Sequence, residues 1–196
     1  MTSKYSSQNE LILKRCLDFY KKNENLETML KIINGESKIS LRIVDWFATN
    51  YAKKYYTLYD LEGSNNEIKR FKVYLDYKLK LKAYSKRRFD PFCRWERINI
   101  PYNETCQIQT TIGQLNFFKW ALENRVVEYI EQHYEEIEND MNSRNSNSKK
   151  RDNSNSSIQT ELVTNDKKTR KRREELSMLA SKSIKKENVE IVVKFN

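Results

Sequence analysis

The feature that most constrains the fold is a long amphipathic segment at residues 110–141, TTIGQLNFFKWALENRVVEYIEQHYEEIENDM. Its apolar side chains recur at helical spacing: Leu115, Phe118, Leu122, Val126, Tyr129, Ile130 and Ile137. Thr111 with Gln114 three positions later is typical of a capping box at a helix start. The pair Asn124–Arg125 is a candidate break, so we expect either one helix or a helix–turn–helix.

Two further helical regions are predicted upstream. Residues 7–35 indicate a helical pair, because Ser7 and Glu10 form a capping-box pattern, Asn25 can cap the second helix and Gly35 can end it. Residues 41–54 are ambiguous. Their first apolar residues alternate like a strand, but the spacing farther along favours a helix after Ser40.

Residues 71–83 alternate strictly between apolar and mostly charged side chains, FKVYLDYKLKLKA. Such alternation places one set of side chains on one face of a strand, so we predict a strand here. Residues 55–61, YYTLYDL, are its expected partner across the loop EGSNNE, giving a long β-hairpin. Pro91 and Pro101 end regular structure downstream.

Composition separates a domain from a tail. Only three glycines and two prolines argue against a turn-rich sandwich or barrel. We predict a single α+β domain at residues 7–141, with a helical pair, a hairpin and a C-terminal amphipathic helix. Residues 142–196 are predicted to be a disordered basic low-complexity tail, because Asn/Ser-rich sequence buries too little apolar surface. VEIVVKF, with a strand pattern at 189–195, is expected to dock on a sheet edge or on a protein partner.

Charge predicts an anionic partner. The net charge is +10, and residues 69–97 hold eleven Lys or Arg against three acids. Nucleic acid is the commonest such partner, followed by an acidic membrane surface or protein. No eighteen-residue apolar run occurs and the N-terminus lacks an apolar signal region, so we expect a soluble protein with no membrane partner.

Nucleic-acid binding is predicted through lysines on one face of the strand and through aromatic residues interleaved with arginines, which suit phosphate contacts and base stacking. The candidate residues are Lys78, Lys80, Lys82, Tyr84, Lys86, Arg87, Arg88, Phe92, Arg94, Trp95 and Arg97. The alternative is that the aromatic residues are core and the lysines protect an edge strand.

The run KKTRKRR adds a second basic cluster, which is typical of a nucleic-acid arm or a nuclear localisation signal. Its candidate residues are Lys167, Lys168, Arg170, Lys171, Arg172 and Arg173. A solubilising tail is the alternative.

Catalysis finds little support. No phosphate-binding loop, dinucleotide-binding glycine pattern or zinc-protease motif is present, and we predict no catalytic residues, metal site or cofactor. A zinc site would need all three cysteines and His133, the only histidine, to converge. A metal-dependent nuclease would need a few carboxylates, for which the candidates are Asp76, Asp90, Glu96 and Glu104.

Three blocks carry a family resemblance: SLRIVDWFATNYAKK, YLDYKLKLKAYSKRRFDPFCRWERI and TTIGQLNFFKWALENRVVEYI. Over about residues 40–131 the chain resembles a family of short uncharacterised proteins of large nucleocytoplasmic DNA viruses, the giant viruses. The resemblance implies a location in the host cytoplasm, at the viral factory, or in the virion. It brings no catalytic residues, and it leaves the tail outside.

We therefore expect a non-catalytic protein that binds the phosphate backbone of nucleic acid through the basic aromatic segment and the tail. The first alternative is a virion structural or adaptor protein that uses residues 189–195 to pair with a partner sheet. The second is a metal-dependent nuclease.

Overall fold

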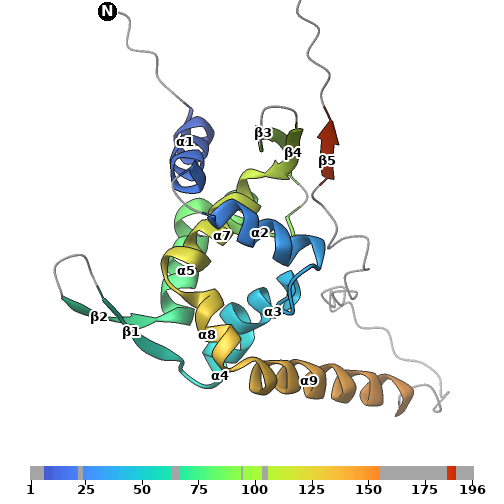
Figure 1. Ribbon diagram of the computed structural model, residues 1–196. Helices are drawn as coiled ribbons and strands as arrows, with labels where there is room; N and C mark the ends of the chain where they lie inside the picture. Colours follow the sequence, from blue (N-terminus) through green and yellow to red (C-terminus); the bar gives the residue numbers. More distant parts are fainter. Residues whose placement is uncertain are drawn as a thin grey trace, which may run out of the picture.

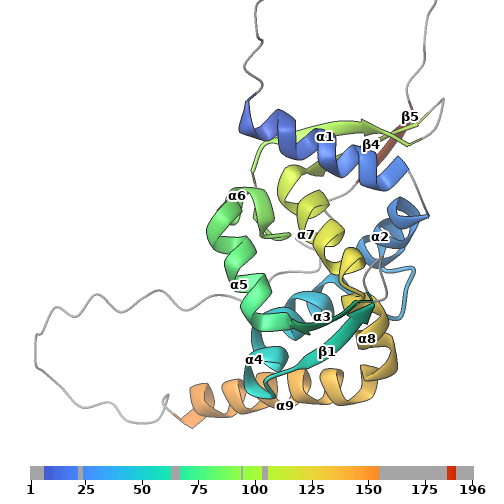
Figure 2. The same ribbon diagram turned by 90° about the vertical axis from the view of Figure 1, so that its left-hand side faces the viewer.

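Helix α7 (Ile112–Glu123) is the helix around which the domain is built. A computed structural model describes residues 7–21, 24–62, 67–93, 95–102, 106–154 and 185–188. The Thr111 side-chain oxygen accepts a 3.2 Å hydrogen bond from the backbone N–H of Gln114, which confirms the predicted helix start. Most α7 side chains are buried, and Figure 2 shows helices packed on several sides of it.

The N-terminal helical pair is present as α1 (Gln8–Lys21) and α2 (Asn25–Asn34). The Ser7 N–H donates to Glu10 Oε2 at 2.9 Å, and the Glu10 N–H donates to Ser7 Oγ at 3.3 Å, so the predicted capping box forms.

The ends of α2 match the prediction at one end only. Gly35 ends the helix with φ +75°, a left-handed conformation that favours glycine. The predicted cap, Asn25, is wrong: it is the first helical residue, and Glu24 occupies the cap position without a side-chain hydrogen bond.

Residues 41–54 are helical, as favoured, but the helix has three parts. They are α3 (Leu41–Trp46), a π-helical turn η1 (Phe47–Tyr51) and α4 (Ala52–Lys54). Ser40 caps α3, because its hydroxyl accepts a 3.3 Å hydrogen bond from the Ile43 N–H.

The predicted strand over residues 71–83 is wrong. The chain forms a short antiparallel hairpin, β1 (Leu58–Glu62) with β2 (Ile68–Lys72), and then turns into helix α5 (Val73–Tyr84). Figure 1 shows the hairpin at one side of the molecule and α5 leading away from it. The hairpin is therefore real but shorter than expected, and Lys78, Lys80 and Lys82 lie on a helix.

A second small sheet closes the other end of the domain. After the four-residue helix α6 (Lys86–Phe89), strands β3 (Arg97–Pro101) and β4 (Cys106–Thr111) form an antiparallel pair. Strand β5 (Lys185–Asn188) joins the free edge of β4, giving the order β3-β4-β5 (Figure 1).

The C-terminal amphipathic segment forms three helices rather than one or two. The predicted break at Asn124–Arg125 separates α7 from α8 (Val126–Gln132), and His133 separates α8 from α9 (Tyr134–Ser154). Residues 142–154, assigned above to the tail, thus continue α9. The predicted strand at 189–195 lies outside the described residues, although β5 just before it docks on a sheet edge.

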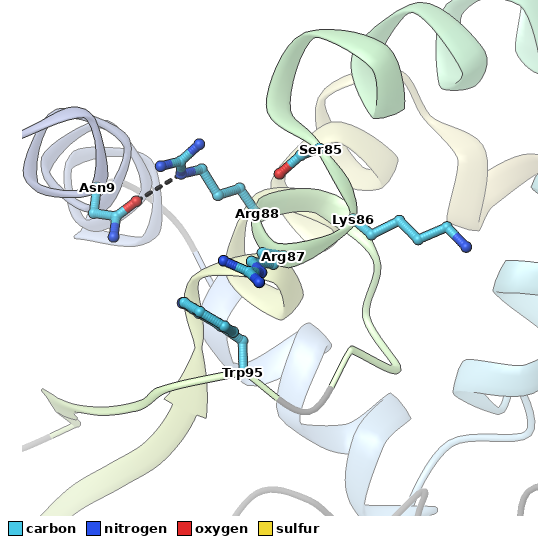
Figure 3. A pocket seen from close by; sticks show the side chains of 6 residues that line it. All are labelled: Asn9, Ser85, Lys86, Arg87, Arg88 and Trp95. Atoms are coloured by element: carbon cyan, nitrogen blue, oxygen red, sulfur yellow. Dashed lines mark hydrogen bonds between the residues drawn. The ribbon is translucent and has the colours of Figure 1, made fainter.

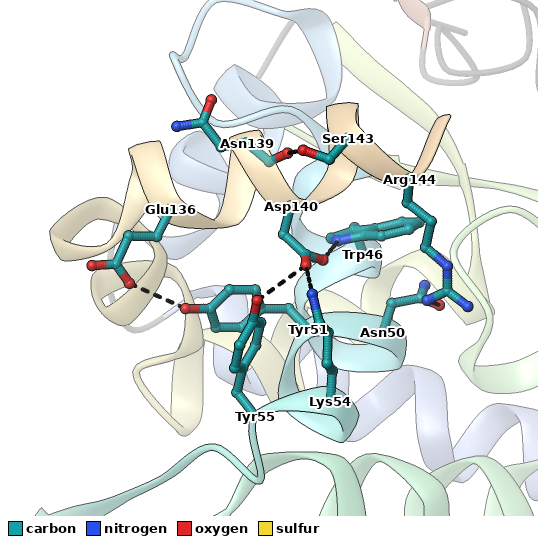
Figure 4. A network of polar contacts seen from close by, with 10 residues as sticks. All are labelled: Trp46, Asn50, Tyr51, Lys54, Tyr55, Glu136, Asn139, Asp140, Ser143 and Arg144. Carbon is teal, nitrogen blue, oxygen red and sulfur yellow. Dashed lines mark hydrogen bonds and ion pairs between the residues drawn. The ribbon is translucent and has the colours of Figure 1, made fainter. Parts of the chain in front are cut away.

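Helix α9 is held on the helices α3, η1 and α4 by a polar network (Figure 4). Asp140 accepts hydrogen bonds from the Trp46 indole at 3.1 Å and from the Tyr55 hydroxyl at 3.3 Å, and it forms an ion pair with Lys54. Burial alone would raise the pKa of Asp140, but the bonds from Lys54 and Trp46 hold its pKa below the ordinary value of 3.8.

One continuous core joins these elements and includes side chains from both sheets. Its largest fully buried members include several aromatic rings, Phe47, Phe89, Phe117 and Phe118. None of the helices in the described part of the chain is long and apolar enough to cross a bilayer.

Candidate nucleic-acid interface

A pocket of about 420 Å³ opens at the junction of α5 and α6 (Figure 3). Four cationic or aromatic side chains and two small polar ones line it: Asn9, Ser85, Lys86, Arg87, Arg88 and Trp95. They come from α1, from the α5–α6 junction and from the segment before β3. The cations come from α6, the aromatic ring from the segment before β3 and the amide of Asn9 from α1, so three parts of the chain meet at the pocket.

The turn between α5 and α6 sets the direction of these side chains. Ser85 has φ +67° and ψ 166°, a backbone conformation that costs free energy for any residue other than glycine. Because Ser85 adopts it, α6 begins directly after α5, and three consecutive cations, Lys86, Arg87 and Arg88, lie in one helical turn.

Helix α6 is fixed against α7 at a site where a side chain would not fit. A Cβ atom at Gly113 would lie 2.9 Å from the backbone oxygen of Asp90 and 3.1 Å from that of Arg87. The Asn116 side-chain amide also donates a 2.9 Å hydrogen bond to the backbone oxygen of Arg88. The cationic turn thus rests on a rigid helix of the core.

Arg87 and Trp95 form a stacked pair in the pocket. The guanidinium carbon lies 3.9 Å from the centroid of the indole ring, within the range of a cation–π contact. The Trp95 side chain is nevertheless 37% exposed, so the ring remains accessible from solvent.

Arg88 is held in place by the first helix. Its Nε donates a 2.6 Å hydrogen bond to Asn9 Oδ1 (Figure 3). In the part of the chain that the structure describes, no carboxylate forms an ion pair with Lys86, Arg87 or Arg88. The positive charge of the pocket is therefore not neutralised by a carboxylate among the described residues.

The predicted row of lysines along one face does not exist. Lys78 and Lys82 are exposed and four residues apart, so they share the solvent face of α5. Lys80 is half-buried and lies about 200° around the helix from Lys78. Leu75 and Leu79, 53% and 63% exposed, occupy the same solvent face as the two exposed lysines.

Other predicted residues lie outside the pocket lining. Tyr84 and Phe92 are half-buried and pack against the core, and the Tyr84 ring stacks on Phe89 with centroids 6.0 Å apart. These two residues therefore pack on the core while part of each stays exposed. Arg97 is exposed on β3 and donates to Gln109 Oε1 at 2.9 Å.

Arg94 and the six candidate residues between 167 and 173 lie outside the described part of the chain. Two pocket residues were missed by the sequence interpretation, Asn9 and Ser85. Ser85 carries a signal, because a serine between two helical segments is typical of a turn. Asn9 carries none, since its role depends on the packing of α1 beside α6.

The carboxylates considered for catalysis have structural contacts. Asp76 accepts a 2.7 Å hydrogen bond from the Trp120 indole, and Asp90 accepts a 2.9 Å bond from the Phe92 N–H. Glu96 is exposed, and Glu104 lies outside the described residues. Within those residues, no three His, Cys, Asp or Glu side chains cluster so that they could hold a metal ion.

Cys16 and Cys93 are free. Cys16 is buried, and burial raises the pKa of its thiol to about 12, so it behaves as a small apolar side chain. Cys93 is half-buried.

Comparison with known proteins places the chain in a family. Residues 1–195 match the model of a family described as "Family of unknown function (DUF7197)". The chain belongs to DUF7197. The match includes the tail, so the narrower resemblance over residues 40–131 underestimates the extent of the shared sequence.

A relative of this DUF7197 chain is "Uncharacterized protein L507" of Acanthamoeba polyphaga mimivirus, which is 48% identical over 119 residues. The alignment covers 58% of this chain and 46% of the relative, so the chain matches less than half the length of that protein. The resemblance to uncharacterised giant-virus proteins is thus confirmed. No solved structure matches the chain.

Proposed function

We propose that this DUF7197 protein associates with nucleic acid without catalysis, through phosphate contacts at the α5–α6 surface. The observation that carries the proposal is the cluster of Lys86, Arg87 and Arg88 beside an exposed tryptophan. Lysine and arginine side chains that contact phosphates release the cations condensed on the nucleic acid, which favours binding at low salt.

The surface extends beyond the pocket. Lys78 and Lys82 lie on the solvent face of α5, the helix that leads into the pocket, and neither forms an ion pair with a described carboxylate. The basic run at residues 167–173 adds a second cluster in the sequence. Contacts of these kinds position a protein on a backbone and carry little sequence information, so binding is expected to be weakly specific.

The relatives of the chain support a location for this nucleic-acid association. A giant-virus protein with a net charge of +10 is suited to the viral factory in the host cytoplasm or to the virion, where genomes are concentrated. The run KKTRKRR also permits a nuclear location.

The test is fluorescence anisotropy with labelled DNA and RNA, single- and double-stranded, from about 50 to 200 mM salt. The full chain is compared with Lys78/Lys82/Lys86→Ala and with a variant in which the six cations of residues 167–173 are replaced by glutamine. The matched control is Lys21/Lys31/Arg42→Ala. The control also removes three positive charges, but from exposed positions on α1, α2 and α3.

We expect the α5–α6 variant to lower the slope of log affinity against log salt by about two to three, and the control to change it by less than about one. A loss of binding seen only when the cations of residues 167–173 are replaced would assign the interaction to the tail. It would contradict the proposed binding surface on α5 and α6. Equal losses in the α5–α6 variant and the control would mean that net charge alone matters. Absence of binding in every case would contradict the function itself.

An adaptor role is the second candidate, and one observation favours it. Leu75 and Leu79 are more than half exposed on the face of α5 that also carries Lys78 and Lys82. A mixed leucine and lysine face suits an acidic amphipathic partner better than a bare phosphate backbone. Loss of a partner after Leu75/Leu79→Ser, with unchanged nucleic-acid binding, would support this function.

A further inference from the structure

We propose that the pocket formed by Asn9, Ser85, Lys86, Arg87, Arg88 and Trp95 accommodates one unpaired nucleotide, with its base stacked on Trp95 and its phosphate held by the neighbouring cations. The proposal rests on the proposed nucleic-acid association and deepens it, because it assigns a substrate class: single-stranded segments in preference to duplex.

The aromatic element of the pocket is suited to a base. The Trp95 indole lies beside α6 and Trp95 is 37% exposed, so part of the ring is accessible to a base. A guanidinium already lies 3.9 Å from the ring centroid, so the indole face accepts a flat cationic group. A base presents a flat surface of comparable kind, and stacking between base and indole is available to every base.

The charged element is suited to the phosphate attached to that base. Arg88 is anchored by its Nε to Asn9 Oδ1 at 2.6 Å, and it therefore loses little conformational freedom when its terminal nitrogens meet an anion. Lys86 and Arg87, in the same turn, are exposed. Figure 3 shows the Arg87 and Arg88 side chains and the indole on one side of α6, while the Lys86 side chain extends in the other direction.

The volume and the backbone agree with a single nucleotide. The pocket of about 420 Å³ is of the size that takes a small molecule rather than a helix or a duplex groove. Its edge contains Ser85, whose φ of +67° is unfavourable for an L-residue. Strained residues of this kind cluster at ligand clamps, and here the turn at Ser85 is followed by Arg87, which lies over the indole.

Duplex DNA or RNA cannot supply this contact without opening, because its bases are stacked on one another. The pocket therefore discriminates by the availability of a base, whereas the lysines of α5 discriminate only by charge.

The experiment uses the full chain and three labelled probes of about twelve units: an oligothymidylate, a strand of the same length with abasic sites throughout, and a duplex. All three carry phosphate, and only the first offers unpaired bases. Anisotropy titrations are run for the natural chain, for Trp95→Leu and for Tyr56→Leu. Tyr56 is a matched control, because it is an aromatic residue 85% exposed outside the pocket.

We expect the natural chain to bind the oligothymidylate about tenfold more tightly than the abasic strand. Trp95→Leu should lower affinity for the oligothymidylate about tenfold, leave the abasic strand unchanged and preserve the thermal unfolding midpoint. Tyr56→Leu should change neither affinity.

Two results would overturn the nucleotide pocket and leave the proposed function standing: equal affinity of the natural chain for the thymidine and abasic strands, or full base preference in Trp95→Leu. Failure of all three probes to bind would instead remove the proposed function, and the pocket with it. Arg87→Gln gives an independent check, because it should weaken both single strands while the preference for bases remains.

Discussion

The absence of a side chain at Gly113 allows α6 to lie against the first turn of α7. The other described glycine with a structural role, Gly35, is required for a different reason: its φ is +75°, while no atom lies within 4 Å of the place a Cβ would take. At Gly113 the conformation is ordinary for a helix, and the constraint is space. One residue therefore sets the distance between the cationic turn and the core.

Gly113→Ala tests this constraint. Alanine is the better helix former by about 1 kcal/mol, so propensity alone predicts a more stable protein. We expect instead a loss of about 1–3 kcal/mol in the free energy of unfolding, because the new Cβ meets two backbone oxygens that cannot rotate away. Urea denaturation measures the change, and a gain in stability would show that α6 moves freely.

The residues of the pocket were only partly predictable from sequence. Lys86, Arg87, Arg88 and Trp95 stand out, because cations and an aromatic ring occur within a short stretch. Their closeness in sequence does not show, however, which way each side chain points in the folded protein. Asn9 could not be found, since a helix 79 residues away in sequence delivers it to Arg88.

At the scale of elements, α5 shows why strict alternation misled the strand prediction. The alternating apolar set also contains a helical stripe, Val73, Tyr77 and Leu81, at four-residue intervals, and Val73 and Tyr77 are buried. The remaining leucines, Leu75 and Leu79, fall on the exposed face. The composition of the segment favours a helix. After Val73 it has no β-branched residue and is rich in lysine and leucine, which are good helix formers.

Asp140 is one of the residues that dock α9, and Asp140→Asn tests its contribution. The Asp140 side chain is only 9% exposed and binds Lys54 and the Trp46 indole. We expect the substitution to lower the free energy of unfolding by about 1–3 kcal/mol at neutral pH, because charged hydrogen bonds between α9 and α3–α4 are weakened. Urea titrations from neutral to acidic pH measure it.

The pH dependence has a definite sign. Because the pKa of Asp140 is lower in the folded protein than its ordinary value of 3.8, the ionised group stabilises the fold above that value. This contribution is lost as the pH falls through the lowered pKa, so the difference between natural chain and variant should shrink in acid. Glu135→Gln, an exposed change of the same charge on the same helix, should cost less than about 0.5 kcal/mol. A difference that persists unchanged in acid would contradict the assignment.

Strand β5 covers an edge that the chain would otherwise leave open. It pairs with β4 in the register Cys106↔Asn188 to Gln109↔Lys185. A chain ending at Ile184 should therefore exchange the amide hydrogens of β4 about tenfold faster than a chain ending at Asn188, as measured by mass spectrometry. Equal exchange in the two chains would show that β5 gives β4 no protection in solution.

At the scale of the whole molecule, α1 is joined to the rest of the domain at both of its ends. Asn9 near its start binds Arg88, and the buried Tyr20 hydroxyl near its end donates a 2.8 Å hydrogen bond to the Leu115 backbone oxygen. Helix α1 is thus part of the domain and is held on α6 and α7.

Tyr20→Phe tests the inner of these two connections. The loss of one buried hydrogen bond should lower the free energy of unfolding by about 1 kcal/mol, while the ring and its packing remain. Tyr56→Phe, at a residue 85% exposed, should be neutral within about 0.3 kcal/mol. Thermal or urea unfolding measures both, and an unchanged midpoint for Tyr20→Phe would show that the bond adds nothing to the docking of α1.

The sequence indicates the α+β class, the helical pair and the break after α7, because caps and apolar stripes are local signals. The β1–β2 hairpin is also predicted, but its end is not, because strict alternation continues into α5. There the packing of Tyr77 on Phe117 and Trp120 of α7 supports the helix that the composition favours. The pocket is a product of the same distant packing.

The π-helical turn η1 is equivalent to one extra residue inserted into an α-helix. Each residue of an α-helix advances about 100°, so a homologue lacking one position here would turn everything after it by about that angle. Tyr51 and Lys54 would then face away from Glu136 and Asp140, their partners on α9. A change in the number of residues between Ser40 and Lys54 would therefore require a compensating change in α9, which packs on this segment.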